Sequence, residues 1–157
     1  MYETGRDLLD ALKAAPDTFR FLLRDVTQEQ ALALKGGDEG WSIVEVMCHL
    51  RDAEERSVER VRQMRTERNP FLPAYDQDAW AVERNYAGQD LREAFEGYIR
   101  FRQQHLAELA LLSPEDWERP GRHEEQGAIT IAAHTLHMVA HDTQHAAQLA
   151  RQLSSGG

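Results

Sequence analysis

Hydrophobic residues recur with the period of an α-helix in four long windows of the chain. These windows span about residues 4–25, 42–67, 90–112 and 132–152. Within each window, apolar side chains return three or four positions apart and so share one face of a helix. No window of useful length alternates apolar with polar residues, and strand signals are therefore almost absent. The pattern predicts an all-α fold built from four helices.

Local signals mark where the first two helices bend, stop and start. Pro16 lies inside the first window and removes a backbone donor, so we expect a kink near residues 12–16 or a fresh start with Pro16 in the first turn. The glycine-rich stretch 36–40 predicts a turn. Ser42, with Glu45 three residues later, has the spacing of a capping box and predicts the start of the second helix.

A long connection, residues 69–89, separates the second window from the third. It carries two prolines and several aromatic residues, and it is too apolar for a free linker. We expect it to fold back over the other helices, with a short helix over residues 76–85. Its aromatic side chains either line the mouth of a pocket or close an open end of the helical assembly. Long connections are commonly functional and free the helices from strict up-and-down order.

The connection between the third and fourth windows is typical of one extra turn followed by a loop. Ser113 and Pro114 fit an N-cap and a first helical residue, so a short turn is expected there, with Trp117 packed inward. Residues 119–127 are expected to form a loop. Thr130 or a neighbour then caps the last helix.

Composition and charge indicate one acidic domain in the cytoplasm. With 157 residues and a mass of 18.0 kDa, residues 1–157 fit a single domain with a substantial core. A net charge of -9 and a pI near 5.2 argue against nucleic-acid binding, which needs a basic face. No apolar run approaches the roughly 20 residues of a membrane span, and the first residues lack the apolar core of a signal peptide. The single cysteine, Cys48, excludes an intrachain disulfide and suits a reducing compartment.

The last window contains four of the seven histidines: His134, His137, His141 and His145. His141 and His145 are four residues apart, so their rings share one helix face within reach of one divalent ion. His137 and His141 form an equally good pair, and such a polar sector is also typical of a solvated helix face. Two ligands rarely hold a first-row metal firmly, so a third must come from elsewhere. His49, about two turns into the second helix, is a candidate because bundles build metal sites from facing helices.

Three stretches, taken in order and separation, carry a family resemblance. They are Gly-Trp-Ser-Ile-Val-Glu-Val-Met-Cys-His-Leu-Arg-Asp-Ala-Glu at 40–54, Pro-Phe-Leu-Pro-Ala-Tyr-Asp-Gln-Asp-Ala-Trp at 70–80 and Ala-His-Asp-Thr-Gln-His-Ala-Ala-Gln-Leu at 140–149. Together they make nearly the whole chain resemble the DinB/YfiT-like superfamily. The resemblance implies a four-helix bundle with a long crossover between the second and third helices.

The resemblance also implies a divalent metal ion held by three histidines, one from the second helix and two from the fourth. Matched to this chain, these ligands are His49, His141 and His145. His137 then becomes a candidate for the surrounding pocket, and His134 a surface residue near the start of its helix. In some relatives that use low-molecular-weight thiols a glutamate replaces one histidine, whereas all three positions are histidine here.

The activity that the resemblance implies is metal-dependent hydrolysis of a small molecule, or transfer and isomerisation assisted by a low-molecular-weight thiol such as mycothiol or bacillithiol. Zinc and nickel lead the candidate metals, with iron, manganese and copper as alternatives. Two other classes stay open, a non-catalytic metal-binding or stress-response protein and a structural helical-bundle dimer without metal. The expected partners are a small-molecule substrate and a second copy in a homodimer, but neither a membrane nor a nucleic acid.

Hydrolysis at such a site would also need a general acid or base. Adjacency along the helices suggests Asp52, Glu45 and Asp142, although no carboxylate among them stands out. The Asp142 side chain points about 100° away from that of the preceding residue, so it is expected to serve packing or a dimer contact. The two remaining histidines, His105 and His123, are expected on the surface, although His123 lies near the start of the fourth helix and could reach a site there.

Overall fold

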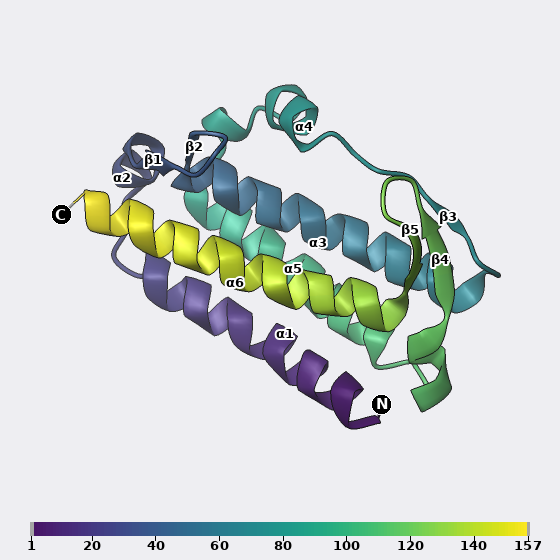
Figure 1. The fold of residues 1–157 in the computed structure, drawn as a ribbon. Coiled ribbons are helices and arrows are strands. Elements are labelled where there is room, and N and C mark those ends of the chain that lie inside the picture. Colours follow the sequence, from purple (N-terminus) through teal and green to yellow (C-terminus); the bar gives the residue numbers. More distant parts are fainter. Residues whose placement is uncertain (1, 157) are drawn as a thin grey trace.

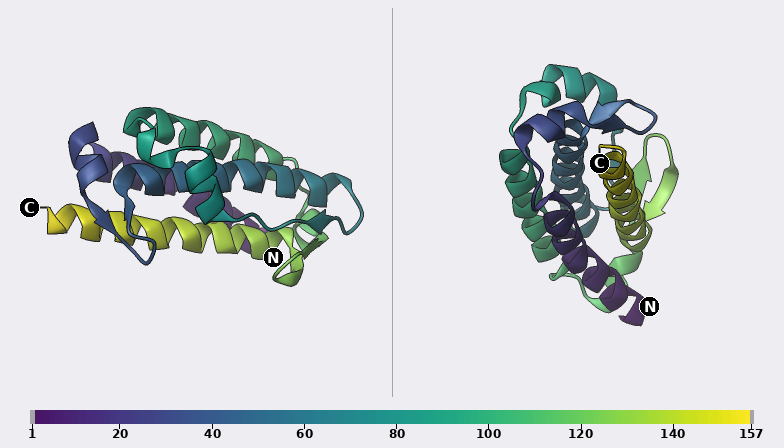
Figure 2. Two further views of the ribbon diagram at one scale, coloured as in Figure 1. Left: turned by 90° about the horizontal axis from the view of Figure 1, so that it is seen from above. Right: turned by 90° about the vertical axis from the view of Figure 1, so that its left-hand side faces the viewer.

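Four long helices form the body of the molecule (Figure 1). The computed structural model describes residues 2–156, with side chains from residue 5 onward. The long helices are α1 (Tyr2–Leu23), α3 (Ile43–Thr66), α5 (Leu91–Leu109) and α6 (Ile131–Ser155). Seen end-on, they surround a common interior (Figure 2, right). The arrangement confirms the all-α four-helix bundle, and no helix in the described range is long and apolar enough to cross a membrane.

The three long helices after α1 begin where the sequence predicts, because a side chain near each start accepts from a free backbone N–H. At α3, the Glu45 N–H donates to Ser42 Oγ and the Ser42 N–H donates to the Glu45 carboxylate, both at 3.2 Å. Thr130 caps α6 by accepting from the Ala133 N–H at 3.1 Å. Asp90 caps α5 in the same way. These caps fix the starts of both helices that carry the candidate metal ligands.

Pro16 does not start a second helix, because α1 continues through it. Proline lacks the N–H that would bond the carbonyl four residues earlier, which is that of Leu12. The Leu12 carbonyl instead accepts a hydrogen bond from the Arg102 guanidinium at 2.7 Å. A donor from α5 thus replaces the missing local one.

Short strands, which the sequence did not predict, pair loop segments at the two ends of the bundle. They are β1 (Lys35–Gly36), β2 (Trp41–Ser42), β3 (Phe71–Leu72), β4 (Pro120–His123) and β5 (Gly127–Thr130). β1 and β2 are antiparallel, while β4 pairs in parallel with β3 and antiparallel with β5. The loop expected over residues 119–127 is therefore wrong, since this segment forms most of a β-hairpin. Strands of two to four residues are too short to show an alternating pattern.

The crossover between α3 and α5 passes back along α3 and contains α4 (Gln77–Glu83), inside the segment predicted to be helical. Cation–π contacts stack this segment on α3. The guanidinium carbon of Arg56, on α3, lies 4.5 Å from the centroid of the Trp80 ring and 5.5 Å from that of the Tyr75 ring. The crossover is therefore a packed part of the molecule and not a free linker.

Hydrogen bonds also tie the crossover to the β4–β5 hairpin. The Arg122 N–H donates to the Pro70 carbonyl at 2.8 Å, and the Glu124 N–H donates to the Leu72 carbonyl at 3.0 Å. The Glu124 carboxylate accepts from the Ala74 N–H at 2.8 Å. The crossover and the hairpin, which are far apart in the sequence, thus form one continuous rim at this end of the bundle.

Apolar side chains from the four long helices fill most of the interior. The remaining short helices are α2 (Gln28–Ala33), η1 (Tyr86–Gly88) and η2 (Pro114–Glu118), and Trp117 of η2 is buried as predicted. A buried ionic group interrupts this core. The Arg102 guanidinium contacts the carboxylates of Glu54 and Asp142 at 2.8 to 2.9 Å.

Candidate metal centre

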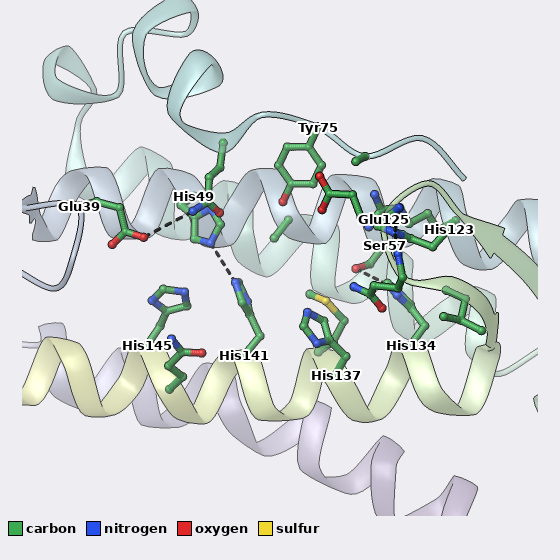
Figure 3. A pocket seen from close by; sticks show the side chains of 18 residues that line it. Glu39, His49, Ser57, Tyr75, His123, Glu125, His134, His137, His141 and His145 are labelled. Atoms are coloured by element: carbon green, nitrogen blue, oxygen red, sulfur yellow. Dashed lines mark hydrogen bonds between the residues drawn. The ribbon is translucent and has the colours of Figure 1, made fainter. Parts of the chain in front are cut away.

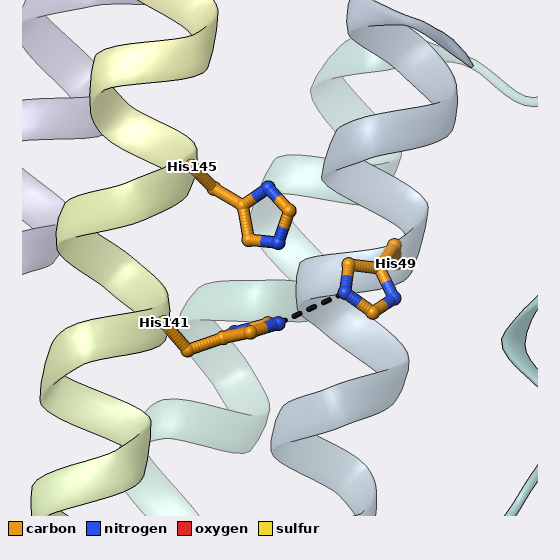
Figure 4. A group of neighbouring side chains, drawn as sticks. All are labelled: His49, His141 and His145. Atoms are coloured by element: carbon orange, nitrogen blue, oxygen red, sulfur yellow. Dashed lines mark hydrogen bonds between the residues drawn. The ribbon is translucent and has the colours of Figure 1, made fainter. Parts of the chain in front are cut away.

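Three imidazole rings converge between α3 and α6 (Figure 4). His49 comes from α3, and His141 and His145 come from successive turns of α6. One ring nitrogen of each lies within 4.8 Å of the others, and the Nε2 atoms of His49 and His141 are 2.9 Å apart. The structure therefore brings together the three histidines that the sequence singled out.

Burial keeps these rings neutral. His49 and His145 are buried and His141 is half-buried. Burial, followed by the charge of His145, lowers the pKa of His49 to about 3. Burial also lowers the pKa of His141 well below its ordinary value, and lowers that of His145 despite its hydrogen bond to Gln148. Neutral imidazoles present the nitrogen lone pairs that metal ions bind.

Gln148 fixes the tautomer of His145. The His145 Nδ1 and Gln148 Oε1 atoms are 2.8 Å apart, and because the amide oxygen can only accept, Nδ1 carries the proton. The lone pair of His145 is therefore on Nε2. Metal-binding histidines are commonly oriented by such a contact from the other ring nitrogen.

The arrangement fits a divalent ion better than it fits hydrogen bonding alone. One N–H can bridge the Nε2 atoms of His49 and His141, yet the buried Nδ1 atoms of both rings lack a hydrogen-bond partner in the described part of the chain. Three neutral nitrogens facing one point form a donor set that suits zinc and similar ions and leaves a coordination position open.

A cavity of about 340 Å³ adjoins the three histidines and continues along the groove between α3 and α6 (Figure 3). Tyr75 and Gln77 of the crossover line it on one side, and Glu125 and Gln126 of the hairpin line it at the far end. The crossover therefore lines a pocket, as one of the two alternatives for its aromatic residues predicted.

The other histidines are distributed differently from the prediction. His137 is exposed and lines the cavity, as expected of a pocket residue. The surface positions expected for His134, His105 and His123 are wrong, because all three are buried. His134 Nε2 lies 3.3 Å from the Ser57 hydroxyl, and His105 Nδ1 lies 2.9 Å from the Glu54 carboxylate. His123 Nδ1 accepts two backbone N–H groups of its own hairpin turn.

The carboxylates suggested as general acids or bases do not line the cavity. Asp52 accepts hydrogen bonds from the Tyr86 hydroxyl and from Arg51. Asp142 pairs with Arg102, so packing, one of its two expected roles, explains its position. Glu45 is engaged in the cap of α3.

Glu39 and Glu125 are the carboxylates that line the cavity within the described part of the chain. Figure 3 shows Glu39 near His49 and His145, and Glu125 at the opposite end. Each lies in a turn between two paired strands, and the helical pattern predicted none of these strands. The glycine-rich composition around Glu39 was the only local sign of its turn.

Sequence comparison identifies relatives over most of the chain. Residues 11–149 match the DinB superfamily. A protein of Oceanobacillus iheyensis is 28% identical over 142 residues, which cover 86% of this chain and 81% of the relative. A protein of Bacillus mycoides is 27% identical over 139 residues, covering 77% and 79%. Both carry the name "Putative metal-dependent hydrolase".

A solved structure shares the fold. It is described as "YfiT from Bacillus subtilis is a probable metal-dependent hydrolase with an unusual four-helix bundle topology". Its TM-score against this chain is 0.91 at 22% sequence identity, with coverage of 100% of this chain and 90% of that one. The match to the family over residues 11–149 confirms the resemblance seen in the sequence, and the protein belongs to the DinB superfamily.

Proposed function

We propose that the protein is a metal-dependent hydrolase of a small molecule and that His49, His141 and His145 hold its divalent ion. The convergence of three ring nitrogens within 4.8 Å, from two different helices, is the observation that carries the proposal. The names of the relatives from Oceanobacillus iheyensis and Bacillus mycoides support the same class of reaction. That the chain forms one domain over residues 1–157, a homodimer and a cytoplasmic protein stays a prediction.

Each residue of the site would have a separate role in hydrolysis. A divalent ion supplies a Lewis acid that lowers the pKa of water at an open coordination position. The three imidazoles are neutral and leave the ion's charge undiminished, while Gln148 holds His145 in the ligating tautomer. Glu39 lines the cavity near His49 and His145 and is our candidate for the general base that accepts the proton. Zinc and nickel lead the candidate metals, since imidazole nitrogen suits both.

The same donor set would also suit a thiol-dependent transferase, because a metal ion favours the thiolate form of an incoming low-molecular-weight thiol. The two reactions differ in what they consume. A hydrolase turns over an activated ester such as p-nitrophenyl acetate in buffer alone. A transferase needs an added thiol such as cysteine, and its product carries the thiol.

Metal content tests the proposed site directly. We expect tag-free protein to contain about one metal ion per chain by elemental analysis, as a three-histidine site requires. His49→Ala and His145→Ala should each abolish stoichiometric binding, because each leaves only two ligands. His137→Ala is the matched control, since it removes an exposed histidine of the same cavity. It should retain the metal.

Two outcomes would contradict the proposed site. One is wild-type protein that neither contains metal nor takes up zinc or nickel tightly after dialysis. The other is loss of metal from His137→Ala together with retention in His49→Ala, which would place the ion elsewhere along α6.

A further inference from the structure

The groove beside the three histidines has a second, distinct end. His49, Ala53, Ser57 and Arg60 all line the cavity from α3, at spacings that keep them on one helix face. At about 1.5 Å per residue, Arg60 lies about 16 Å along the helix axis from His49. α6 runs antiparallel to α3 here, since His141 faces His49 while His134 faces Ser57. The cavity therefore joins the candidate metal centre to a site at Arg60.

Arg60 is the only lysine or arginine among the described residues that line this cavity. The crossover holds its guanidinium in place. Arg60 Nη2 donates to the Pro73 carbonyl at 2.9 Å, and its guanidinium carbon lies 5.7 Å from the centroid of the Tyr75 ring. Each of these contacts involves a neutral group, so neither neutralises the charge of Arg60.

The neighbouring arginines of α3 are all engaged by carboxylates. Arg51 pairs with Asp52, Arg56 with Glu59, and Arg62 and Arg65 with Glu108. Within the described part of the chain, no ion pair includes Arg60. Glu125 lines the same end of the cavity, but it is exposed and makes no ion pair with Arg60.

The surroundings of Arg60 disfavour an unbalanced charge. Burial, together with the like charge of Arg56, lowers the pKa of Arg60, and the nearby Tyr75, Glu59 and Glu125 do not fully offset this effect. A guanidinium that is half-buried without a carboxylate gains most from an anionic partner, with which it forms short, charge-assisted hydrogen bonds. In a protein with a net charge of -9, binding an anion requires such a local cation.

We propose that Arg60 binds a carboxylate group of the substrate at the end of the cavity opposite the three histidines. Arg60 is a single guanidinium, and the Glu125 carboxylate lines the same cavity and acts on it through its charge, so a singly charged carboxylate is favoured over a doubly charged phosphate. The anion site rests on Arg60 alone, whereas the placement of the reacting group at the three histidines rests on the proposed function. The substrate class is thus a carboxylic acid whose hydrolysable bond lies several bonds from the acid group.

The anion site can be tested without any metal. In metal-free protein, the Nε–Hε NMR signal of Arg60, assigned by its absence in Arg60→Gln, should shift on titration with butyrate. Butyl phosphate should bind more weakly. Arg62→Gln removes the same charge from the same helix outside the cavity, so it is the matched control and should bind butyrate as wild type does. An unmoved Arg60 signal, or tighter binding of butyl phosphate, would overturn the assignment to a carboxylate.

A second experiment tests whether the two ends act on one ligand. Zinc-loaded protein is titrated calorimetrically with linear dicarboxylates from four to twelve carbons and with monocarboxylates of equal length. At one length, the dicarboxylate should bind at least about tenfold more tightly, as expected for one charge-assisted contact. Arg60→Gln should lose this advantage, and Arg60→Lys should keep part of it.

The two experiments separate failure of each proposal. Protein that binds no zinc but shows the butyrate shift of Arg60 would contradict the metal centre and leave the anion site standing. Zinc-loaded protein in which Arg60→Gln binds dicarboxylates as tightly as wild type would contradict the anion site and leave the metal centre standing.

Discussion

At the scale of single residues, Glu39 is the side chain on which turnover is expected to depend most after the metal ligands. It lines the cavity from the turn between β1 and β2, and Figure 3 shows it at the end that holds the three histidines. Burial lowers the pKa of His145, and the hydrogen bond to Gln148 and the charge of the Glu39 carboxylate offset this only in part. An acceptor for a proton is therefore present where hydrolysis would release one.

Replacement of Glu39 by Gln should lower kcat for hydrolysis of p-nitrophenyl acetate by zinc-loaded protein about 100-fold or more, because the amide cannot accept the proton. Zinc content should stay at the wild-type level. Glu125→Gln is the control, since it removes a carboxylate from the opposite end of the cavity. Equal rates for wild type and Glu39→Gln would exclude Glu39 as the base.

The distance in sequence between interacting groups decided which residues could be predicted. Ser42 was predicted as a cap because its partner, Glu45, is three residues away. His105 and His134 were expected on the surface because their partners, Glu54 and Ser57, lie 51 and 77 residues away in the chain. A polar residue on a helix looks solvated until the facing helix is known.

At the scale of elements, the β1–β2 turn lies against Gln148, the residue that orients His145 of the candidate metal centre. Gly37 has a φ of 73°, and a Cβ added there would lie 2.5 Å from the Nε2 atom of Gln148. Gln148 in turn holds His145. Glycine therefore suits this position both for its backbone conformation and for the room that it leaves to the end of the Gln148 side chain.

Gly37→Ala should weaken zinc binding about tenfold, because displacement of Gln148 loosens His145. Gly40→Ala is the matched control. Gly40 has a φ of 68° in the same turn, yet an added Cβ meets nothing within 4 Å. Both variants should lose about 1 kcal/mol of stability from the left-handed conformation, so their difference isolates the contact with Gln148. Equal zinc affinities in a competition assay with a chelator would show that the contact is unimportant.

Long elements were predictable from the sequence and short ones were not. Each long helix has an apolar face that repeats over many turns, whereas β3 and β4 depend on pairing between remote segments. Pro16 shows the same limit inside a helix. Its effect on α1 depends on Arg102, which supplies the Leu12 carbonyl with a donor from α5.

At the scale of the whole molecule, the interior contains many titratable groups. Burial, reinforced by the charges of His105 and Arg60, lowers the pKa of His134 to about 3. Burial raises the pKa of Glu54, but the charges of His105 and Arg102 more than offset this, so its pKa lies well below the usual range. The stability of the fold is therefore expected to depend on pH.

For His134 the sign follows from its lowered pKa. Below the ordinary histidine pKa of about 6.5, His134 is protonated in the unfolded chain but stays neutral in the folded chain. The free energy of unfolding therefore decreases as the pH falls from about 6.5 towards 3. In metal-free protein, His134→Asn should reduce the slope of the unfolding free energy between pH 6 and 4 by about 1.4 kcal/mol per pH unit. Urea denaturation at several pH values measures it. Any offset at pH 7.5 reports lost packing instead, and curves that stay parallel below pH 6 would contradict a neutral, buried His134.

The hydrogen bonds between the crossover and the β4–β5 hairpin have a consequence for how molecules enter. Hydrogen bonds of 2.8 to 3.0 Å join Pro70, Leu72 and Ala74 of the crossover to the hairpin. The crossover and the hairpin therefore cannot separate unless these hydrogen bonds break. We expect the entrance of the cavity to be rigid and to keep a constant width. Substrates would then be selected by their width before any reaction occurs. Bulky analogues would be excluded at the entrance of the cavity even when they carry the reactive bond and the carboxylate.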